Sequence, residues 1–429
     1  MIAPLESPLF QPLRLPGGQT LGNRIAKAAM EENMADARHL PGDALRQLYR
    51  SWAMGGAGLL LTGNVMVAAD AVTGPAGVIL DATQPLQPFR DWAQAGRTNG
   101  ARIWMQINHP GRQVFAATNR QAIAPSAVPL AIQGYAHLFA QPRAMSEEDI
   151  AEVIARFADT AALAEQAGFD GVQVHAAHGY LLSQFLSPLT NRRTDRWGGA
   201  LENRARILTQ IIQAIRARVA PRFGVGVKLN SSDFQKGGFD AQDAVAVVRM
   251  LNPLAVDLVE LSGGSYESPA MHGRPQQAST RPSTAAREAY FVDFARDIVA
   301  EARMPVMVTG GIRRRATAEA ALAAEGDRAG VAMVGLAQAL AYAPDLPNRW
   351  RAGEATVDVP QPRWKNRAIA GLATMALTRL QLRRLGAGSS PRPLAWAPWV
   401  LIRDRLRMAR RSRRYRGWLR RRTAASSAA

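Results

Sequence analysis

The chain has 429 residues, of which 47% are hydrophobic and 20% are charged, and it contains no cysteine. This hydrophobic fraction excludes disorder over most of the chain, because so much apolar surface collapses into a core. The lack of cysteine excludes disulfides, thiolate zinc sites and cysteine-ligated iron–sulfur clusters. The length fits two or three average domains, or one large α/β barrel with extensions.

The positive charge is concentrated at one end of the chain. The whole sequence has 53 Lys and Arg against 34 Asp and Glu, but residues 361–429 alone hold 18 of the basic residues and a single acid, Asp404. Residues 1–360 are therefore almost neutral, and the high pI says nothing about their ligand. We divide the chain into a body, residues 1–360, and an Arg-rich C-terminal extension, residues 361–429.

Neither end of the chain predicts insertion into a membrane. The first ten residues, MIAPLESPLF, lack the basic region and the sustained apolar run of a secretory signal, so we expect a cytoplasmic protein. The most apolar stretches of the extension, 368–378 and 393–402, are about half of the roughly 20 residues that a spanning helix needs. We therefore expect no transmembrane segment.

In the body, short β-rich runs alternate with amphipathic helical segments, which predicts parallel strands joined by crossover helices. The expected strands are Ile25–Met30, Gly58–Gly63, Ile103–Ile107, Gly171–His175, Gly224–Leu229, Leu258–Leu261, Val306–Thr309 and Val331–Val334. The expected helices include Asp43–Met54, Pro85–Thr98, Glu147–Gln166, Leu201–Arg218 and Ala286–Ala302. Ser146 with Asp149 three residues later predicts a cap at the start of the third helix.

Eight such units predict a (β/α)8 TIM barrel, of the α/β class, rather than a doubly wound sheet. A dinucleotide-binding sheet needs a G-x-G-x-x-G after an early strand, and the nearest candidate, residues 55–58, precedes its strand. The segment Phe10–Asn23, with Pro16-Gly17-Gly18 at its centre, predicts a hairpin ahead of the first barrel strand.

Polar residues follow the expected strands, which is where a barrel gathers its active site. The motifs are Leu21-Gly22-Asn23-Arg24-Ile25 running into Ala28-Ala29-Met30, Gln106 to Arg112, the long run from Val172 to Leu208, Val227-Lys228-Leu229-Asn230, Thr309-Gly310-Gly311 and Pro344-Asp345-Leu346-Pro347. Because these motifs occur together and in this order, the chain resembles the old yellow enzyme family of FMN-dependent NADH:flavin oxidoreductases. The resemblance covers roughly residues 5–350.

Two histidines and a tyrosine are the expected catalytic residues. His175 and His178, three apart beyond a strand end, can both donate a hydrogen bond to one substrate oxygen, as stabilisation of an enolate requires. The resemblance implies that Tyr180 donates the proton to the substrate carbon. From the spacing alone, two alternatives stay open: the pair caps backbone groups, or it binds a metal.

For the flavin, the resemblance implies contacts from three groups of residues. One side of the ring system would be lined by Ala28, Ala29, Met30 and Glu31. Gly63 would allow close approach of the backbone, Gln106 would reach the pyrimidine edge, and Lys228 would lie near N1 and the C2 carbonyl. The residues after strands seven and eight would hold the phosphate, namely Gly310, Gly311, Gly335, Ala337 and Gln338. For Lys228 the alternative is a cation paired with an acid in the barrel mouth.

Three positions depart from the family pattern. Glu31 replaces the usual Thr or Cys near the flavin O4 and N5 edge, where it lowers the flavin potential if ionised and donates a hydrogen bond if protonated. Gln338 lies where an Arg commonly binds the phosphate. Ala29 replaces a common proline, a change that should loosen its loop only slightly.

The resemblance implies an FMN-dependent oxidoreductase that uses NAD(P)H to reduce the activated C=C bond of an enone or a related electrophile. Larger relatives carry an iron–sulfur cluster and a second flavin domain. With no cysteine and about 70 residues after the barrel, we expect neither, and we expect electrons to pass directly from NAD(P)H to FMN. Two alternatives are an NAD(P)H oxidase or quinone reductase on the same flavin, and a weakened barrel that serves as a membrane-tethered binding protein.

The extension has a partial helical period of apolar residues among arginines over 401–419, with Trp396 and Trp399 just before. A basic helix with aromatic neighbours is typical of one that binds an anionic membrane surface, which predicts peripheral binding at the inner face of the membrane. Nucleic acid is a weaker competitor, since Arg clusters also neutralise phosphates. The third interpretation is that the extension is a solvated basic tail without a binding partner. The oligomeric state does not follow from the sequence.

Overall fold

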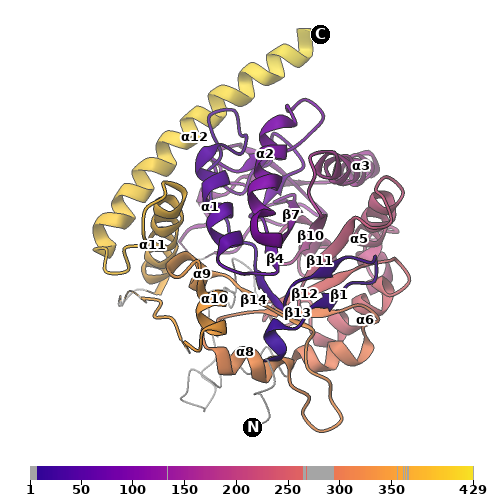
Figure 1. Ribbon diagram of the computed structural model, residues 1–429. Helices are drawn as coiled ribbons and strands as arrows, with labels where there is room; N and C mark the ends of the chain where they lie inside the picture. Colours follow the sequence, from indigo (N-terminus) through magenta and orange to yellow (C-terminus); the bar gives the residue numbers. More distant parts are fainter. Residues whose placement is uncertain are drawn as a thin grey trace, which may run out of the picture.

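The structure is a computed structural model that describes residues 7–132, 134–263, 267, 294–354, 356–360, 362, 364 and 367–428. Its centre is a closed barrel of eight parallel strands, surrounded by helices (Figure 1). Each barrel strand pairs with the next one along the chain, and the last pairs with the first. The predicted (β/α)8 barrel is confirmed.

All eight predicted strands are present; the strand over 306–309 has the predicted bounds, and the bounds of the others differ by a few residues. They are β3 (Ile25–Lys27), β4 (Leu59–Leu61), β7 (Arg102–Asn108), β10 (Gly171–Ala176), β11 (Gly224–Asn230), β12 (Leu258–Ser262), β13 (Val306–Thr309) and β14 (Met333–Leu336). Four short strands were not predicted: β5 (Val65–Met66) and β6 (Val78–Ile79) extend the sheet beside β7, and β8 (Gln121–Ala124) pairs with β9 (Gln141–Ala144) in a loop.

The helices of the body are α1 (Asp43–Met54), α2 (Gln87–Gly96), α3 (Glu147–Gln166), α4 (Leu181–Leu186), α5 (Leu201–Arg216), α6 (Ala241–Leu251), α8 (Arg315–Leu322), α9 (Gln338–Tyr342) and α10 (Leu346–Arg351). Three single 3-10 turns are η1 (Pro8–Phe10), η2 (Thr98–Gly100) and η3 (Ala136–Leu138). The predicted cap of α3 is a full capping box between Ser146 and Asp149. The helix expected over 286–302 lies partly outside the described residues, and 294–301 are helical.

The N-terminal end of the barrel is filled by apolar side chains. The predicted hairpin is present as β1 (Leu13–Arg14) paired with β2 (Thr20–Leu21), and its leucines pack with the buried ring of Trp104 inside the barrel. Gly171, Gly224 and Gly226 face that ring, and a Cβ at any of them would collide with it. The polar side chains inside the barrel therefore lie at its other end, the C-terminal ends of the strands.

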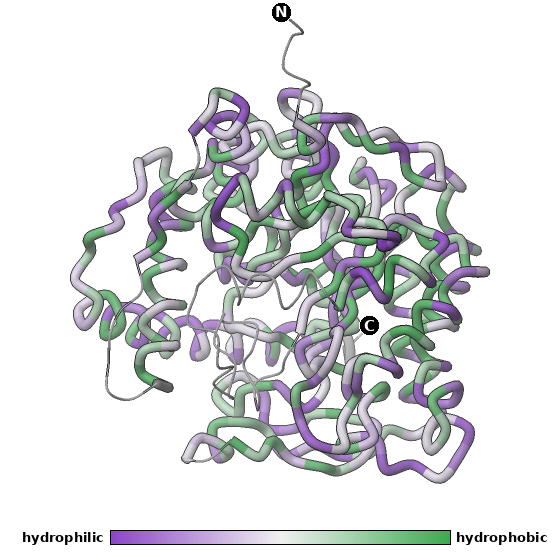
Figure 2. Tube along the Cα trace, turned by 90° about the horizontal axis from the view of Figure 1, so that it is seen from below, coloured by the Kyte–Doolittle hydropathy of each residue, from purple (hydrophilic) through white to green (hydrophobic). Residues whose placement is uncertain are grey.

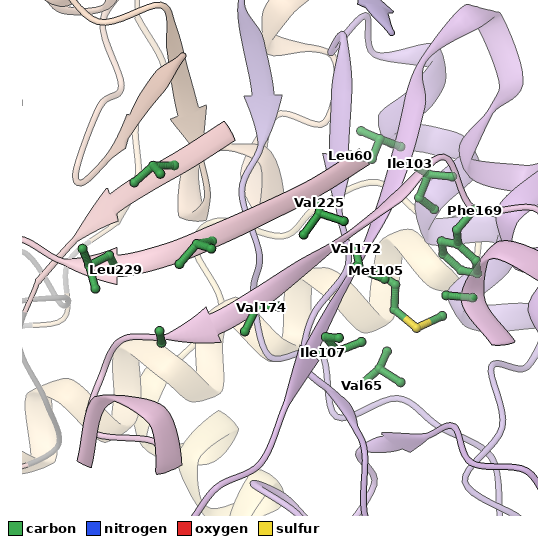
Figure 3. Packing of buried hydrophobic residues seen from close by; sticks show 14 of the residues in the cluster. Leu60, Val65, Ile103, Met105, Ile107, Phe169, Val172, Val174, Val225 and Leu229 are labelled. Atoms are coloured by element: carbon green, nitrogen blue, oxygen red, sulfur yellow. The ribbon is translucent and has the colours of Figure 1, made fainter. Parts of the chain in front are cut away.

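The outer faces of the strands form the larger core. Residues such as Ile103, Met105, Val172 and Val174 alternate with the inward positions and pack together with Phe169 under the helices (Figure 3). The surrounding helices alternate hydrophilic and hydrophobic residues along their length (Figure 2). Burial of both strand faces therefore holds the barrel rigid under the loops that carry the polar residues.

The described residues of the extension form two helices, α11 (Arg367–Gly386) and α12 (Ala397–Ala428), which confirms its predicted helical character. α11 packs on α1, with Leu382 and Leu385 joining the outer core, and α12 runs beside α11 along one side of the barrel (Figure 1). The buried Asp404 joins the two helices through Arg379 (2.7 Å) and Arg383 (3.3 Å). Within the described part of the chain, no helix has both the length and the hydrophobicity to cross a membrane.

Candidate active site

Four consecutive barrel strands end in the same pattern, with two polar residues separated by one apolar residue. The pairs are Gln106/Asn108 on β7, Gln173/His175 on β10, Lys228/Asn230 on β11 and Glu260/Ser262 on β12. Alternate residues of a strand share a face, and Trp104 places the even positions of β7 inside the barrel. These pairs form two polar layers at the C-terminal mouth.

The lower layer is a continuous chain of hydrogen bonds across the barrel. Gln106 donates to Gln173 (2.7 Å), Gln173 donates to one oxygen of Glu260 (2.7 Å), and Lys228 donates to the other (2.7 Å). All four side chains are buried. Glu260 therefore neutralises Lys228, as one reading of the sequence expected, while the role of Lys228 toward flavin stays a prediction.

The upper layer holds the histidine pair. His175 Nε2 lies 3.2 Å from His178 Nδ1, and His178 Nε2 lies 2.8 Å from the Ser262 hydroxyl. His175 Nδ1 accepts the Ala177 N–H (3.3 Å), which puts the His175 proton on Nε2 and directs the chain from His175 through His178 to Ser262. The two histidines are thus bonded to each other, not both directed at one external oxygen.

The surroundings of the pair keep His175 neutral and fix the orientation of His178. Burial, and after it the positive charge of Lys228, holds the pKa of His175 well below 6.5. His178 has a left-handed backbone (φ 61°), held by its N–H donating to the Asn230 side chain (3.1 Å). Tyr180, which is also buried, packs edge-on against His175 with ring centroids 4.8 Å apart. The structure therefore brings the three predicted catalytic residues together.

The loop after β3 brings the predicted flavin-lining residues to the same end of the barrel. Ala28 is buried and its N–H donates to the Leu336 carbonyl (2.9 Å), while Ala29 and Met30 are half-buried. One carboxylate oxygen of Glu31 accepts from Asn64 (2.8 Å) and from Thr73 (2.8 Å).

The environment of Glu31 changes its acidity. Although the residue is only half-buried as a whole, desolvation of its carboxyl group raises the pKa from 4.5 to about 7, and the bonds to Asn64 and Thr73 only partly oppose this. Both states of the carboxyl considered from the sequence are thus accessible near neutral pH.

Gly63 is required by close packing of the chain. A Cβ there would collide with Glu32 and with the Met30 carbonyl, and the Gly63 N–H donates to Glu32 (3.1 Å) and to Tyr49 (3.0 Å). The fully buried Lys27 completes this cluster by donating to Tyr49 (3.0 Å) and to a backbone carbonyl (2.7 Å). Burial lowers the pKa of Lys27 to about 8. The cluster fixes the β3 loop against the end of β4.

The residues expected at the phosphate follow two paired strands. Thr309 of β13 lies opposite Gly335 of β14, and Gly310 and Gly311 come next on the first strand. A Cβ at Gly335 would collide with the Thr309 hydroxyl. Ala337 precedes α9, whose first residue, Gln338, donates to the Thr378 hydroxyl of α11 (3.1 Å). Gln338 is thus linked to the extension.

Unsatisfied polar atoms test whether the mouth suits a flavin. Among the described residues, neither amide atom of the fully buried Asn108 has a hydrogen-bond partner, and the Thr309 hydroxyl also lacks one. Buried polar groups are almost always paired, so these inward strand ends need a polar ligand. A ring system with a carbonyl- and nitrogen-bearing edge and a phosphate fits this need.

Several site residues were not singled out from the sequence. Gln173, Glu260 and Ser262 complete the two layers, and Asn108 and Asn230 belonged to quoted motifs without an assigned role. The signal that could have found them is the two-residue spacing of polar side chains at the ends of β7, β10, β11 and β12, since that spacing puts both members inside the barrel.

A (β/α)8 barrel with this mouth has the architecture of flavin-dependent barrel oxidoreductases. The sequence pattern of the NADH:flavin oxidoreductase / NADH oxidase family matches residues 8–356, and the chain belongs to this family. The family supports FMN as the cofactor and NAD(P)H as the electron donor, and it confirms the resemblance found in the sequence.

Individual relatives agree with this assignment. The chain is 40% identical over 357 residues to the NADH-dependent flavin oxidoreductase iliE of Neonectria sp. (strain DH2), covering 79% of this chain and 46% of that protein. It is 38% identical to the NADH-dependent flavin oxidoreductase nadA of Aspergillus parasiticus, covering 72% of each. The chain thus spans about half the length of some relatives and most of the length of others.

Solved structures show the same barrel. The old yellow enzyme homologue from Zymomonas mobilis superposes with a TM-score of 0.68 at 25% identity, covering 82% of this chain and 94% of that one. A 2-naphthoyl-CoA reductase gives a TM-score of 0.72 at 26% identity, covering 81% of this chain and 52% of that one.

Proposed function

We propose that the protein uses FMN and NAD(P)H to reduce the activated C=C bond of an α,β-unsaturated carbonyl or a related small electrophile. The observation that carries this proposal is the hydrogen-bonded His175–His178 pair beside Tyr180, placed at the mouth of a barrel of the NADH:flavin oxidoreductase family. When bound, FMN supplies hydride to the β-carbon of the substrate.

The residues assigned to FMN surround the mouth. Ala28, Ala29, Met30 and Glu31 would line the ring system, with Gly63 keeping their loop close to β4. Gln106 and Lys228 belong to the lower polar layer and would face the pyrimidine edge, with the charge of Lys228 balanced by Glu260. Gly310, Gly311, Gly335, Ala337 and Gln338 would hold the phosphate after β13 and β14.

The chain's own residues polarise the substrate and supply a proton. His175 carries its proton on Nε2, so a substrate oxygen can take this donor in place of His178 Nδ1. His178 would then turn its ring away from Ser262 and donate to the same oxygen. The N–H groups of both rings would stabilise the negative charge that develops on this oxygen by hydrogen bonds. Tyr180, against the edge of His175, donates its phenolic proton to the substrate carbon.

The test uses the colour and reoxidation of the purified protein. We expect a yellow protein with absorbance at about 450 nm, reduced by NAD(P)H and then rapidly reoxidised by an enone in stopped flow. A colourless protein that FMN fails to reconstitute would refute the proposal.

A second candidate keeps the flavin but passes electrons to oxygen or a quinone. A relative from Thermoanaerobacter brockii named NADH oxidase, 33% identical over 79% of this chain, favours it. Reoxidation by a quinone or by oxygen that is faster than by every enone tested would select this candidate. The weakened binding barrel, motivated by Glu31 and Gln338, predicts instead slow reoxidation by all three acceptors.

We also propose that the protein is cytoplasmic and associates peripherally with the inner face of the membrane. The support is the set of exposed apolar and arginine side chains of the extension.

A further inference from the structure

Exposed large apolar side chains gather at one place on the molecule. In the part of the chain that the structure describes, eight are exposed: Met54, Tyr135, Leu138, Leu394, Trp396, Trp399, Ile402 and Leu406. Five of the eight lie within residues 394–406. Trp396 is 71% exposed and Leu394 is 93% exposed. Single exposed apolar residues are ordinary, but such a concentration marks an interaction surface.

Three of these side chains form a stripe on α12. Trp399, Ile402 and Leu406 are three and four residues apart, so they lie on one face of the helix, and we call them the apolar stripe. The opposite face is covered, since Val400 packs on α11 and Asp404 is buried in its ion pairs with Arg379 and Arg383. The stripe therefore faces outward.

Exposed arginines flank the apolar stripe. Arg403, Arg407 and Arg410 are exposed beside it, and more follow toward the C-terminus. Asp404 is the single acid of α12, and it is already neutralised by α11. The outward side of the helix thus combines apolar bulk with unopposed positive charge.

The same helix borders the catalytic mouth. The Tyr415 hydroxyl donates to the Ala69 carbonyl (2.8 Å), Arg411 donates to the Asn33 carbonyl, and Arg416 donates to the Ala117 carbonyl (2.5 Å). These carbonyls lie in the loops after β3, β5 and β7. All three loops leave the C-terminal ends of their strands, so α12 lies along the rim of the site.

We propose that the apolar stripe and its flanking arginines dock on an anionic phospholipid bilayer. An interfacial helix inserts apolar side chains at the boundary of headgroups and acyl chains, while its arginines attract anionic headgroups. Nucleic acid would use the arginines but gains nothing from exposed isoleucine and leucine at this spacing. A second copy of this chain would bring two strongly basic surfaces together. The bilayer alone complements both features.

Docking has a consequence for the substrate, and this consequence rests on the proposed function. A bilayer held by α12 lies beside the rim of the mouth. The site is then placed to take an electrophile that partitions into the bilayer, such as a quinone or enone with a long alkyl chain.

The docking experiment needs no turnover. Full-length protein is floated with phosphatidylcholine vesicles that contain or lack phosphatidylglycerol. We expect much stronger binding to the anionic vesicles than to pure phosphatidylcholine. This binding should weaken but persist as salt rises, because salt screens the arginines and not the apolar burial. Replacing the stripe (Trp399→Ser, Ile402→Ser, Leu406→Ser) should reduce vesicle affinity about tenfold or more.

Two matched variants separate the contributions. Met54→Ser removes an equally exposed apolar side chain (53%) outside residues 394–406, and it should leave vesicle binding unchanged. Arg403→Gln, Arg407→Gln and Arg410→Gln together should weaken binding and flatten its salt dependence. All variants change exposed side chains, and an unchanged melting temperature verifies that they fold.

Three results would overturn docking on a bilayer. One is full-length protein that ignores anionic vesicles and binds duplex DNA with a steep salt dependence. Another is equal loss of vesicle binding in the stripe variant and in Met54→Ser. The third is a stripe variant that turns a dimer into a monomer without any change in vesicle binding.

The substrate consequence is measured separately, as reduction of a long-chain quinone in anionic vesicles and of a water-soluble enone. The stripe variant should lose at least about tenfold on the quinone and nothing on the enone. An equal effect of the stripe variant on both acceptors would overturn the consequence and leave docking intact. Inactivity on both in the wild-type protein would count against the proposed function alone.

Discussion

The barrel and the α11–α12 pair use charged residues in opposite ways. In the barrel mouth charges are buried and paired, as Lys228 is with Glu260 at 2.7 Å. On α12 eleven arginines accompany one acid, and most of these arginines are exposed. The polar groups of the barrel mouth thus bond to one another inside the protein, whereas most charged groups of α12 face outward.

This difference suggests two separate roles: the barrel mouth for the proposed reaction, and α12 for binding to other surfaces. A change in the mouth should alter a half-reaction or the stability of the whole barrel, because each polar group there has fixed neighbours in a dry interior. A change on α12 should alter what the protein binds at its surface. The predictions below would break this division if a mouth variant proved silent, or if an α12 variant changed the barrel.

The largest expected effect is that of Tyr180→Phe on the second half-reaction. Loss of a general acid typically slows a proton-dependent step by about 10²–10⁴-fold. Reduction of the flavin by NAD(P)H needs no proton from this residue and should stay near the wild-type rate. Stopped-flow measurement of both half-reactions checks this, and equal slowing of both would remove Tyr180 from the donor role.

Lys228→Met should have the next largest effect, on stability. It leaves Glu260 buried without its cation, and breaking a buried ion pair in this way costs about 3–5 kcal/mol. Urea unfolding measures this loss. In the double variant Lys228→Met/Glu260→Met, much of it should be recovered. A single variant as stable as wild type would mean that the pair contributes nothing to the barrel.

The same contrast explains how far the sequence could be read. Barrel strands pair with their neighbours along the chain, so the alternation of runs such as Gly171–Ala176 and Gly224–Asn230 predicts both the fold and the end at which His175 and Lys228 meet. The mutual bond of His175 and His178 was not predictable, because it depends on ring orientation within the mouth.

The position of the extension on the barrel could not be predicted from the sequence, for a different reason. Tyr415 meets Ala69 across 346 positions of the chain, and Arg411 meets Asn33 across 378. No periodicity connects such distant segments. Composition predicted a basic helix with aromatic neighbours, but only the fold puts that helix beside the mouth of the barrel.

Glu31→Gln should change how stability depends on pH. Burial raises the pKa of Glu31 from 4.5 to about 7, so the folded protein prefers the protonated carboxyl. The stability that this preference provides is complete below about pH 4.5 and is lost as pH rises through about 7. Glutamine mimics the neutral form and avoids this loss.

The comparison is made by urea unfolding at about pH 5 and about pH 8. From the lower to the higher of these pH values, the free energy of unfolding of Glu31→Gln should rise by about 1–3 kcal/mol relative to that of wild type. If the difference between the two proteins is the same at both pH values, Glu31 does not titrate in this range. The flavin potential of the variant should also depend less on pH across neutrality.

The smallest effect is expected for Tyr415→Phe, which tests the attachment of α12 itself. The ring of Tyr415 is buried with Trp418 beside His39, and its hydroxyl makes one hydrogen bond, to the Ala69 carbonyl. Phenylalanine keeps the apolar contact and removes that bond, at a cost of about 0.5–1.5 kcal/mol. Local opening should therefore speed amide hydrogen exchange in α12 by about 2–10-fold, while the barrel strands keep their protection and both half-reactions keep their rates. Equal loss of protection in β7 and β10 would break the division between the two regions, since it would make α12 part of the barrel's cooperative unit.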